Sequence, residues 1–400
     1  MDVHHALPLL AGLSPVQFMR RHWQKKPLLV RGAIAGFKPL LSRAELFKLA
    51  ASEGVESRLI VKNGDKNADG WKMKSGPFTQ RSLPPASTPG WTLLVQGVDG
   101  HHSGVHQLLQ QFRFVPDARL DDLMMSFATP GGGVGAHFDS YDVFLFQASG
   151  RRRWKISQQK DLSLQAGVPL KILQNFAPEE EFVLEAGDML YLPPRYAHDG
   201  VAEACVGADG KAQDCMTYSI GFKAPVQAEL TAELLHKLAE FSEDAGEDAQ
   251  ADRPKKIYRD PGQTATSTPA ELPAAMVTFA ADAVRRALQD PLALACALGE
   301  TMTEPKSQTW FEQTGTAWHN PTAGQALHLD AKTRMMYDAH HVFINGESYR
   351  AKGRDAQLMR LLADQRALPA LALAKASGGA LDLLADWHAQ GWIHLRKDQN

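Results

Sequence analysis

The hydrophobic pattern over roughly residues 25 to 223 is that of many short β-strands. Runs of β-branched and aromatic residues alternate with Gly, Pro or Asp, which interrupt them. A high density of short strands is typical of a barrel or a double-sheet jelly roll. The predicted strands are Leu28–Val30, Trp91–Val95, Tyr141–Gln147, Arg152–Ile156, Glu181–Leu184, Met189–Leu192 and Met216–Phe222.

The pattern changes to a helical period after Pro225. From Gln227 to about Phe241 the apolar residues recur at three- and four-residue steps, which predicts a helix with one hydrophobic face. The stretch from Glu240 to Asp252 then carries acids and no base, and Ser/Thr-rich residues 263–268 follow. We interpret it as a solvated linker, with an acidic docking patch as the alternative.

The last part of the chain mixes helical and strand-like segments. Helices are predicted around 273–288 and 291–302, then at 355–365 and 380–389, and a closing strand at 391–395. Asn345-Gly346 between strand-like flanks is a strong hairpin signal. Helices with a hairpin favour a winged-helix-like unit. Because bases exceed acids by only two over residues 351–400, packing or protein interaction is favoured over direct nucleic-acid binding.

Composition narrows the class of protein further. Lys plus Arg number 43 and Asp plus Glu 45, which gives a net charge of −2, and 44% of the residues are hydrophobic. Global disorder and whole-protein binding of polyanions are therefore disfavoured. The three cysteines are too few for a disulfide framework. With no signal peptide and no apolar run long enough for a bilayer, we expect a cytoplasmic protein without membrane contact.

One short segment carries candidate metal chemistry. His137 and Asp139 follow a glycine-rich stretch at the start of a strand-like run. Residues i and i+2 of a strand face the same side, so the imidazole and the carboxylate would converge on one point. A third ligand would complete a 2-His-1-carboxylate facial triad for Fe(II). Of the other histidine-rich runs, His101–His106 fits a polar loop better than a metal site, and His4-His5 and His340-His341 carry even less information.

The same spacing also occurs elsewhere, which shows that it is weak evidence alone. His328-Leu329-Asp330 repeats it, but no glycine-rich approach and no comparable strand accompany it. His198 follows a Gly-Asp turn, a strand and a Pro-Pro corner, so we predict that it faces His137 from a barrel mouth. Arg152 alternates in direction with Arg151 and Arg153 on a predicted strand, and its planar guanidinium suits a buried carboxylate.

Taken together, these segments resemble the Fe(II)- and 2-oxoglutarate-dependent oxygenases of the JmjC/cupin superfamily. More closely, the chain is similar to the bacterial ribosomal oxygenases, which hydroxylate an arginine of the sixteenth large-subunit ribosomal protein. The matching stretches are His22–Leu29, Pro130–Phe144, Gly150–Trp154, Gly187–His198 and Tyr218–Phe222.

The resemblance implies an α+β multidomain architecture. A double-stranded β-helix of the JmjC/cupin jelly-roll type would occupy residues 1–225. A helical dimerisation region with the acidic linker would occupy 226–290, and a winged-helix-like domain 291–400. A homodimer and a large-subunit ribosomal protein substrate are the implied partners.

The resemblance also implies roles for individual residues. His137, Asp139 and His198 would bind Fe(II), and Arg152 the distal carboxylate of 2-oxoglutarate, with dioxygen as the second cosubstrate. Ser126 would help to bind 2-oxoglutarate, although an ordinary buried strand serine is the alternative. Tyr141 and Asp142 are candidates for substrate contact, with a packed tyrosine and a turn aspartate as equal alternatives.

Two features depart from the family pattern, and two other functions stay open. The Ala204–Cys215 segment is longer than expected, and Thr217 stands where asparagine is expected, so either could alter the rim of the pocket. The alternatives are an oxygenase for a histidine or another residue of a different protein, and a catalytically silent cupin that acts as a protein or RNA adaptor.

Overall fold

The computed structural model describes residues 2–62, 70–207, 210–248, 257–261, 265, 270–313, 315, 318–319, 322 and 325–397. The chain divides into two compact units. The first comprises residues 1–224 with 307–310, and the second comprises 225–306 with 311–400. None of the described helices is both long and apolar enough to cross a membrane.

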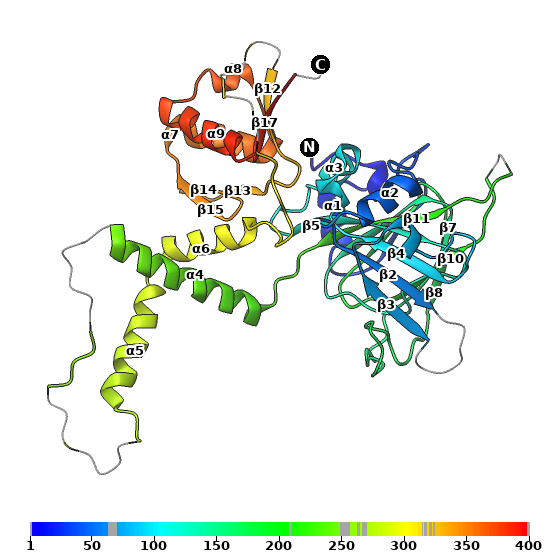
Figure 1. The fold of residues 1–400 in the computed structure, drawn as a ribbon, viewed down its shortest axis with the longest axis horizontal. Coiled ribbons are helices and arrows are strands. Elements are labelled where there is room, and N and C mark those ends of the chain that lie inside the picture. Colours follow the sequence, from blue (N-terminus) through cyan, green and yellow to red (C-terminus); the bar gives the residue numbers. More distant parts are fainter. Residues whose placement is uncertain are drawn as a thin grey trace. The chain divides into compact units, whose positions relative to one another are not determined.

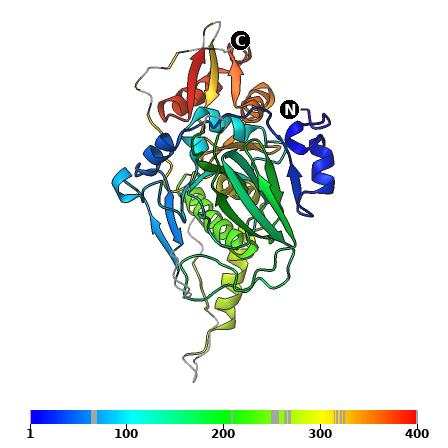
Figure 2. The ribbon, with the colours of Figure 1, turned by 90° about the vertical axis from the view of Figure 1, so that its right-hand side faces the viewer.

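Two antiparallel sheets make up most of the first unit (Figures 1 and 2). The larger sheet has the strand order β1-β9-β6-β11-β5-β4-β2-β3, and the smaller sheet has the order β10-β7-β8. The strands are β1 (Leu28–Val30), β2 (Ser57–Lys62), β3 (Trp71–Ser75), β4 (Trp91–Val95), β5 (Leu120–Ala128), β6 (Val143–Ser149), β7 (Arg151–Ser157), β8 (Glu180–Leu184), β9 (Met189–Leu192), β10 (Ala197–Glu203) and β11 (Cys215–Phe222).

The alternation of side chains along the strands creates a core on each face of the larger sheet. On β6, Phe144 and Phe146 pack in a core with the N-terminal helices, whereas Val143 and Leu145 pack in a second core with Trp154 of β7. The second core therefore lies between the two sheets. The helices of this unit are η1 (Pro8–Leu10), α1 (Pro15–Arg21), α2 (Arg43–Ala50), η2 (Gln80–Ser82), η3 (Val98–Gly100) and α3 (Ser103–Gln110).

The second unit begins with three helices. In α4 (Gln227–Asp248) the buried Leu238 lies on the apolar face, and the helix packs against α6 (Pro291–Thr303) (Figure 1). The predicted linker is wrong at its start, because α4 continues to Asp248. Glu and Ala are good helix formers, so the acidic run does not end the helix there. The rest of the acidic run, together with most of residues 263–268, lies outside the described residues.

The remainder of the second unit confirms the winged-helix-like prediction. The Asn345-Gly346 turn, with positive φ at both residues, joins β14 and β15 as a tight hairpin. One core holds Leu327, Leu362 and Trp387. The elements are α5 (Ala274–Ala287), β12 (Gln325–Leu329), β13 (Met335–Tyr337), β14 (His341–Ile344), β15 (Glu347–Arg350), α7 (Gly353–Gln365), β16 (Ala367–Pro369), α8 (Ala370–Leu373), α9 (Gly378–Ala389) and β17 (Ile393–Lys397), in sheets ordered β16-β12-β17 and β13-β14-β15.

Candidate metal centre and cosubstrate pocket

Three side chains converge beside the start of β10. Ligand atoms of His137, Asp139 and His198 all lie within 4.8 Å of one another, and this is the one such group among the described residues. The Nε2 atom of His198 is 3.6 Å from Oδ2 of Asp139, and the two imidazole centroids are 4.2 Å apart. Two nitrogens and one carboxylate on one side of a point form the donor set of a facial triad.

Backbone pairing brings the two histidines together. The His137 amide donates to the His198 carbonyl at 2.9 Å, and the His198 amide donates back to the His137 carbonyl at 2.8 Å. One difference from the sequence prediction follows, because His137 sits in a single β-bridge instead of a regular strand, while His198 belongs to strand β10 and faces His137 as predicted.

The orientation of both imidazoles is fixed by carbonyl oxygens. Nδ1 of His137 lies 2.9 Å from the Gly135 carbonyl, and Nδ1 of His198 lies 2.9 Å from the Tyr196 carbonyl. With Nδ1–H donating to these carbonyls, each Nε2 lone pair is left for a metal. Burial, followed by the nearby His137, lowers the pKa of His198 to about 4. His198 is therefore in the neutral form that binds a metal at neutral pH.

The glycines before His137 are required by close packing. A Cβ on Gly133 would lie 2.6 Å from the Gly200 carbonyl oxygen, and one on Gly132 would lie 2.4 Å from the Trp91 carbonyl oxygen. Gly135 has φ +82°, which L side chains rarely adopt. The segment can therefore press against β10 and β4, which places His137 opposite His198.

Arg152 is a buried cation with unsatisfied donors. Its side chain lies on β7 in the same alternating set as the core residues Trp154 and Ile156, and the residue is only 3% exposed. Its Nε and Nη2 atoms have no hydrogen-bond partner in the structure. Arg151 and Arg153 instead pair with surface glutamates, as the predicted alternation requires. An unpaired buried guanidinium is costly, so this position suits a bound anion.

Ser126 belongs to a polar patch on the inner face of the larger sheet. Its neighbours Met125 and Phe127 pack in the outer core, so Ser126 faces the smaller sheet. It is paired across the strands with Thr217, whose hydroxyl donates to Oε1 of Gln147 at 2.9 Å. Thr217 therefore lies inside the sandwich beside Ser126, and not at the pocket rim as its departure from the family pattern suggested. Of the long segment, residues 208 and 209 lie outside the described residues.

The two proposed substrate residues, Tyr141 and Asp142, differ sharply in solvent exposure and in their hydrogen bonds. Tyr141 is 39% exposed, and burial of its hydroxyl, followed by the charge of Asp139, raises its pKa. A hydrogen bond between Tyr141 and Asp139 adds to this shift. Asp142 is fully buried and accepts hydrogen bonds from Tyr191 at 2.6 Å and Gln24 at 3.0 Å. A structural role, as in the alternative to substrate contact, thus fits Asp142, because both of its carboxylate oxygens already accept hydrogen bonds within the protein.

One exposed residue at the site was missed by the sequence reasoning. Arg195 has φ +65°, its amide donates to the Asp139 carbonyl at 2.7 Å, and its guanidinium lies over the Phe138 ring. A left-handed non-glycine residue costs free energy and often marks a functional turn. The Pro193-Pro194 corner before it was a signal for a turn, but not for this contact.

Comparison with known proteins identifies the two parts of the chain. A family model for the JmjC domain matches residues 107–230. The chain contains a JmjC domain. A model for the ROXA-like winged helix matches residues 286–394. The JmjC match covers all three candidate metal ligands together with Arg152 and Ser126.

Curated proteins that are similar to this chain include bacterial ribosomal oxygenases. Ribosomal protein uL16 3-hydroxylase of Escherichia coli is 39% identical over 216 residues, which are 53% of each chain. A probable ribosomal oxygenase of Haemophilus influenzae is 35% identical over 217 residues, 53% of this chain and 50% of the relative. The match thus spans about half the length of these relatives. The bifunctional lysine-specific demethylase and histidyl-hydroxylase NO66 of Drosophila persimilis is 26% identical over 205 residues, 49% of this chain and 29% of the relative.

Solved structures extend the likeness to both units. The structure of E. coli YcfD has a TM-score of 0.78 with 28% identity, over 95% of this chain and 97% of that one. YcfD in complex with cobalt and 2-oxoglutarate has a TM-score of 0.75 at 28% identity, over 96% and 98% of the two chains. The resemblance to bacterial ribosomal oxygenases and the predicted fold class are confirmed.

Proposed function

We propose that this protein is an Fe(II)- and 2-oxoglutarate-dependent oxygenase that hydroxylates an arginine side chain of ribosomal protein uL16. The observation that carries the proposal is a facial-triad donor set together with a buried arginine that has unused donors on β7, the strand that pairs with the His198 strand β10. The name of the E. coli relative, ribosomal protein uL16 3-hydroxylase, supports the substrate.

The residues of this chain fit both cosubstrates. His137, Asp139 and His198 would hold Fe(II), because their donor atoms are directed to one point and both imidazoles have fixed tautomers. Arg152 would bind the distal carboxylate of 2-oxoglutarate through its unused donors, and Ser126 would add a hydroxyl from the opposite sheet. When bound, iron with 2-oxoglutarate and dioxygen supplies the oxidation of a C–H bond.

The protein environment restricts where this chemistry takes place. The Trp154 ring lies near the His198 ring, with centroids 5.8 Å apart and the ring planes tilted, and the apolar core around Trp154 would shield this side of the site from water. The exposed Tyr141 and Arg195 lie on the outer side of Asp139. We propose that substrate approaches from this side and that Tyr141 contacts it while holding the Asp139 carboxylate in place.

The test is anaerobic reconstitution with Fe(II) and 2-oxoglutarate, followed by air and an arginine-containing uL16 peptide. Gain of one oxygen on the arginine, seen by mass spectrometry, should disappear in His137→Ala and persist in His328→Ala. Succinate without an oxidised peptide would retain the oxygenase and reject this substrate. No product from folded, iron-loaded protein would favour the silent adaptor.

A histidine target is the second candidate, because the Drosophila relative is named a histidyl-hydroxylase. Mass spectrometry of whole ribosomal proteins after the same reaction separates the candidates. Oxygen on a histidine, with uL16 unchanged, would select the second one.

We also propose that the protein forms a homodimer. In the structure, α5 offers a more exposed apolar surface for this contact than α4, the helix on which the sequence-based expectation rested. The apolar face of α4 is partly covered by α6. In contrast, α5 has no buried residue. It exposes the large apolar side chains of Met276, Val277 and Val284, and its C-cap residue Leu288 is exposed as well. A monomeric mass by light scattering at micromolar concentration would reject the dimer.

Because the proposed substrate is ribosomal, we also propose a cytoplasmic location.

A further inference from the structure

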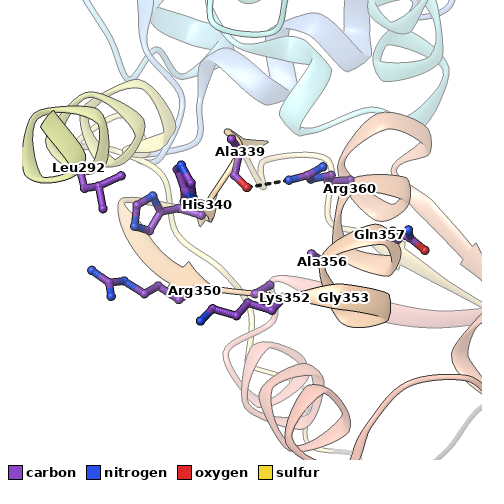
Figure 3. Close-up of a pocket in the computed structure, with 11 residues that line it drawn as sticks. Leu292, Ala339, His340, Arg350, Lys352, Gly353, Ala356, Gln357 and Arg360 are labelled. Carbon is purple, nitrogen blue, oxygen red and sulfur yellow. Dashed lines mark hydrogen bonds between the residues drawn. The ribbon is translucent and has the colours of Figure 1, made fainter.

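The winged-helix unit contains a cavity lined by several basic side chains. It has a volume of about 540 Å³, and residues of α6, the loop before β14, the end of β15 and the start of α7 line it (Figure 3). The charged and titratable lining residues are Arg350, Lys352, Arg360, His340 and His341. No carboxylate is among the residues that line it.

The basic side chains face one another across this cavity. Arg350 and Lys352 lie on one side, and His340 lies with Ala339 and Arg360 on the other (Figure 3). Arg360 is held by two carbonyl oxygens, since its Nη2 donates to Asp338 at 3.2 Å and to Ala339 at 3.0 Å. These contacts use neutral acceptors, so the charge of Arg360 is not neutralised by them.

The nearby carboxylates are occupied by other groups. Asp338 accepts from the His341 amide at 2.6 Å and lies 3.3 Å from the His341 ring nitrogen. Asp355, in the first turn of α7, accepts from the Ser377 amide and hydroxyl. In the part of the chain that the structure describes, no carboxylate forms an ion pair with Arg350 or Lys352.

The start of α7 adds to the positive potential. Lys352 is its N-cap and makes no side-chain capping hydrogen bond, while Gly353 and Ala356 line the cavity. The first amides of a helix lack intrahelical acceptors and carry the positive end of the helix dipole. Like charges collected around a cavity of small-molecule size, beside such amides, favour a multiply charged anion.

We propose that this cavity binds phosphate groups, supplied either by an RNA backbone or by a free polyphosphate. The charge count over residues 351–400 disfavoured nucleic-acid contact, but it could not show that Arg350 and His340 join Lys352 and Arg360 around one cavity. The site stands apart from the proposed oxygenase chemistry, because none of its residues belongs to the JmjC match.

Calorimetry on the full-length protein tests the proposal with two probes, tripolyphosphate and a short single-stranded oligouridine RNA. Arg350→Gln and Lys352→Gln should each weaken binding about tenfold, the loss typical of a charge-assisted contact. Arg354→Gln is the matched control, because it removes the same charge from an exposed first-turn residue of α7 that does not line the cavity. It should change the affinity by less than about twofold.

The two probes separate the sources. Binding of tripolyphosphate without RNA binding, with the same dependence on Arg350, supports a free polyphosphate. RNA binding that depends on Arg350 and is competed by tripolyphosphate supports an RNA backbone. The proposal is overturned if neither probe binds up to about 1 mM, a concentration that covers ordinary non-specific affinity. Equal loss in Arg354→Gln and Arg350→Gln also overturns it, since that result means diffuse attraction.

Discussion

The chain contains the His-x-Asp spacing twice, and the two copies differ in what faces them. At Asp139, the opposing His198 has its Nδ1 bound to a carbonyl, and its Nε2 stays 3.6 Å from the carboxylate. At Asp330, the opposing His394 places Nε2 at 3.0 Å from the carboxylate, within hydrogen-bond distance. The first copy leaves donor atoms for a metal, whereas the second uses them in an internal contact.

The comparison teaches that the backbone around a motif decides its chemistry. His137 exchanges both backbone hydrogen bonds with His198, after glycines that permit close approach. His328 lies in the regular strand β12 and is paired with His394 of β17. Asp330 directly follows the end of β12, and its carboxylate contacts the His394 ring. Four predictions test this contrast, beginning with the largest expected effect.

Asp139→Ala should abolish iron retention and 2-oxoglutarate turnover. Loss of even a supporting residue at a metal site costs about 10–100-fold, so loss of a ligand should exceed a hundredfold. Iron content and succinate yield measure the effect. Asp330→Ala is the matched control and should keep both; an equal loss in the control would remove the distinction between the two copies.

Arg152→Met should raise the KM for 2-oxoglutarate about a hundredfold, because a buried charge-assisted contact is lost. Methionine retains much of the apolar stem, which keeps the packing beside Trp154. Succinate formation against 2-oxoglutarate concentration measures the change. Arg151→Met removes an exposed arginine from the same strand and should leave the KM nearly unchanged; a comparable rise there would contradict the assigned role of Arg152.

Metal-free protein should lose stability as the pH falls from neutrality. His198 has its pKa lowered from 6.5 to about 4, so the unfolded state binds more protons between these values and folding weakens as pH drops. From pH 7 to pH 5 this contribution is about 2 kcal/mol. Urea unfolding of wild type and His198→Asn, followed at both pH values, measures it. The variant should lose about 2 kcal/mol less, and parallel losses would argue against a buried neutral His198.

Asp330→Asn should have the smallest effect, a destabilisation of the winged-helix unit of about 1 kcal/mol. Burial alone would raise the pKa of Asp330, but hydrogen bonds from His394 and the Lys332 amide outweigh it and lower the pKa. Thermal unfolding measures the loss, and succinate yield should not change. A loss of activity without a change in stability would mean that Asp330 has a role beyond this contact.

The sequence predicted the elements that carry strong local patterns. The apolar runs at β4, β7, β9 and β11, and the Asn-Gly hairpin, are present in the structure. Strand β10 was missed because Asp199 and Gly200 are poor strand formers, and pairing with β7 along its whole length outweighs that preference. Similarly, Asp121 and Asp122 obscured β5, which lies between β4 and β11.

Contacts between distant residues set the limit of prediction at the site. The spacing around His137 suggested the ligands, and alternation along β7 correctly predicted the buried direction of Arg152. The partners of Asp142 could not be predicted in this way, because Tyr191 and Gln24 lie 49 and 118 positions away. Roles that depend on such contacts cannot be predicted from local sequence patterns.

The most direct test of the central claim is optical titration under anaerobic conditions. Fe(II) and 2-oxoglutarate are added to wild-type protein, Asp139→Ala and Asp330→Ala, and the charge-transfer absorption of the iron–2-oxoglutarate chelate is recorded. The account predicts one chelate per chain in wild type and Asp330→Ala, and none in Asp139→Ala. Retention of the band in Asp139→Ala, or its loss in folded Asp330→Ala, would contradict it.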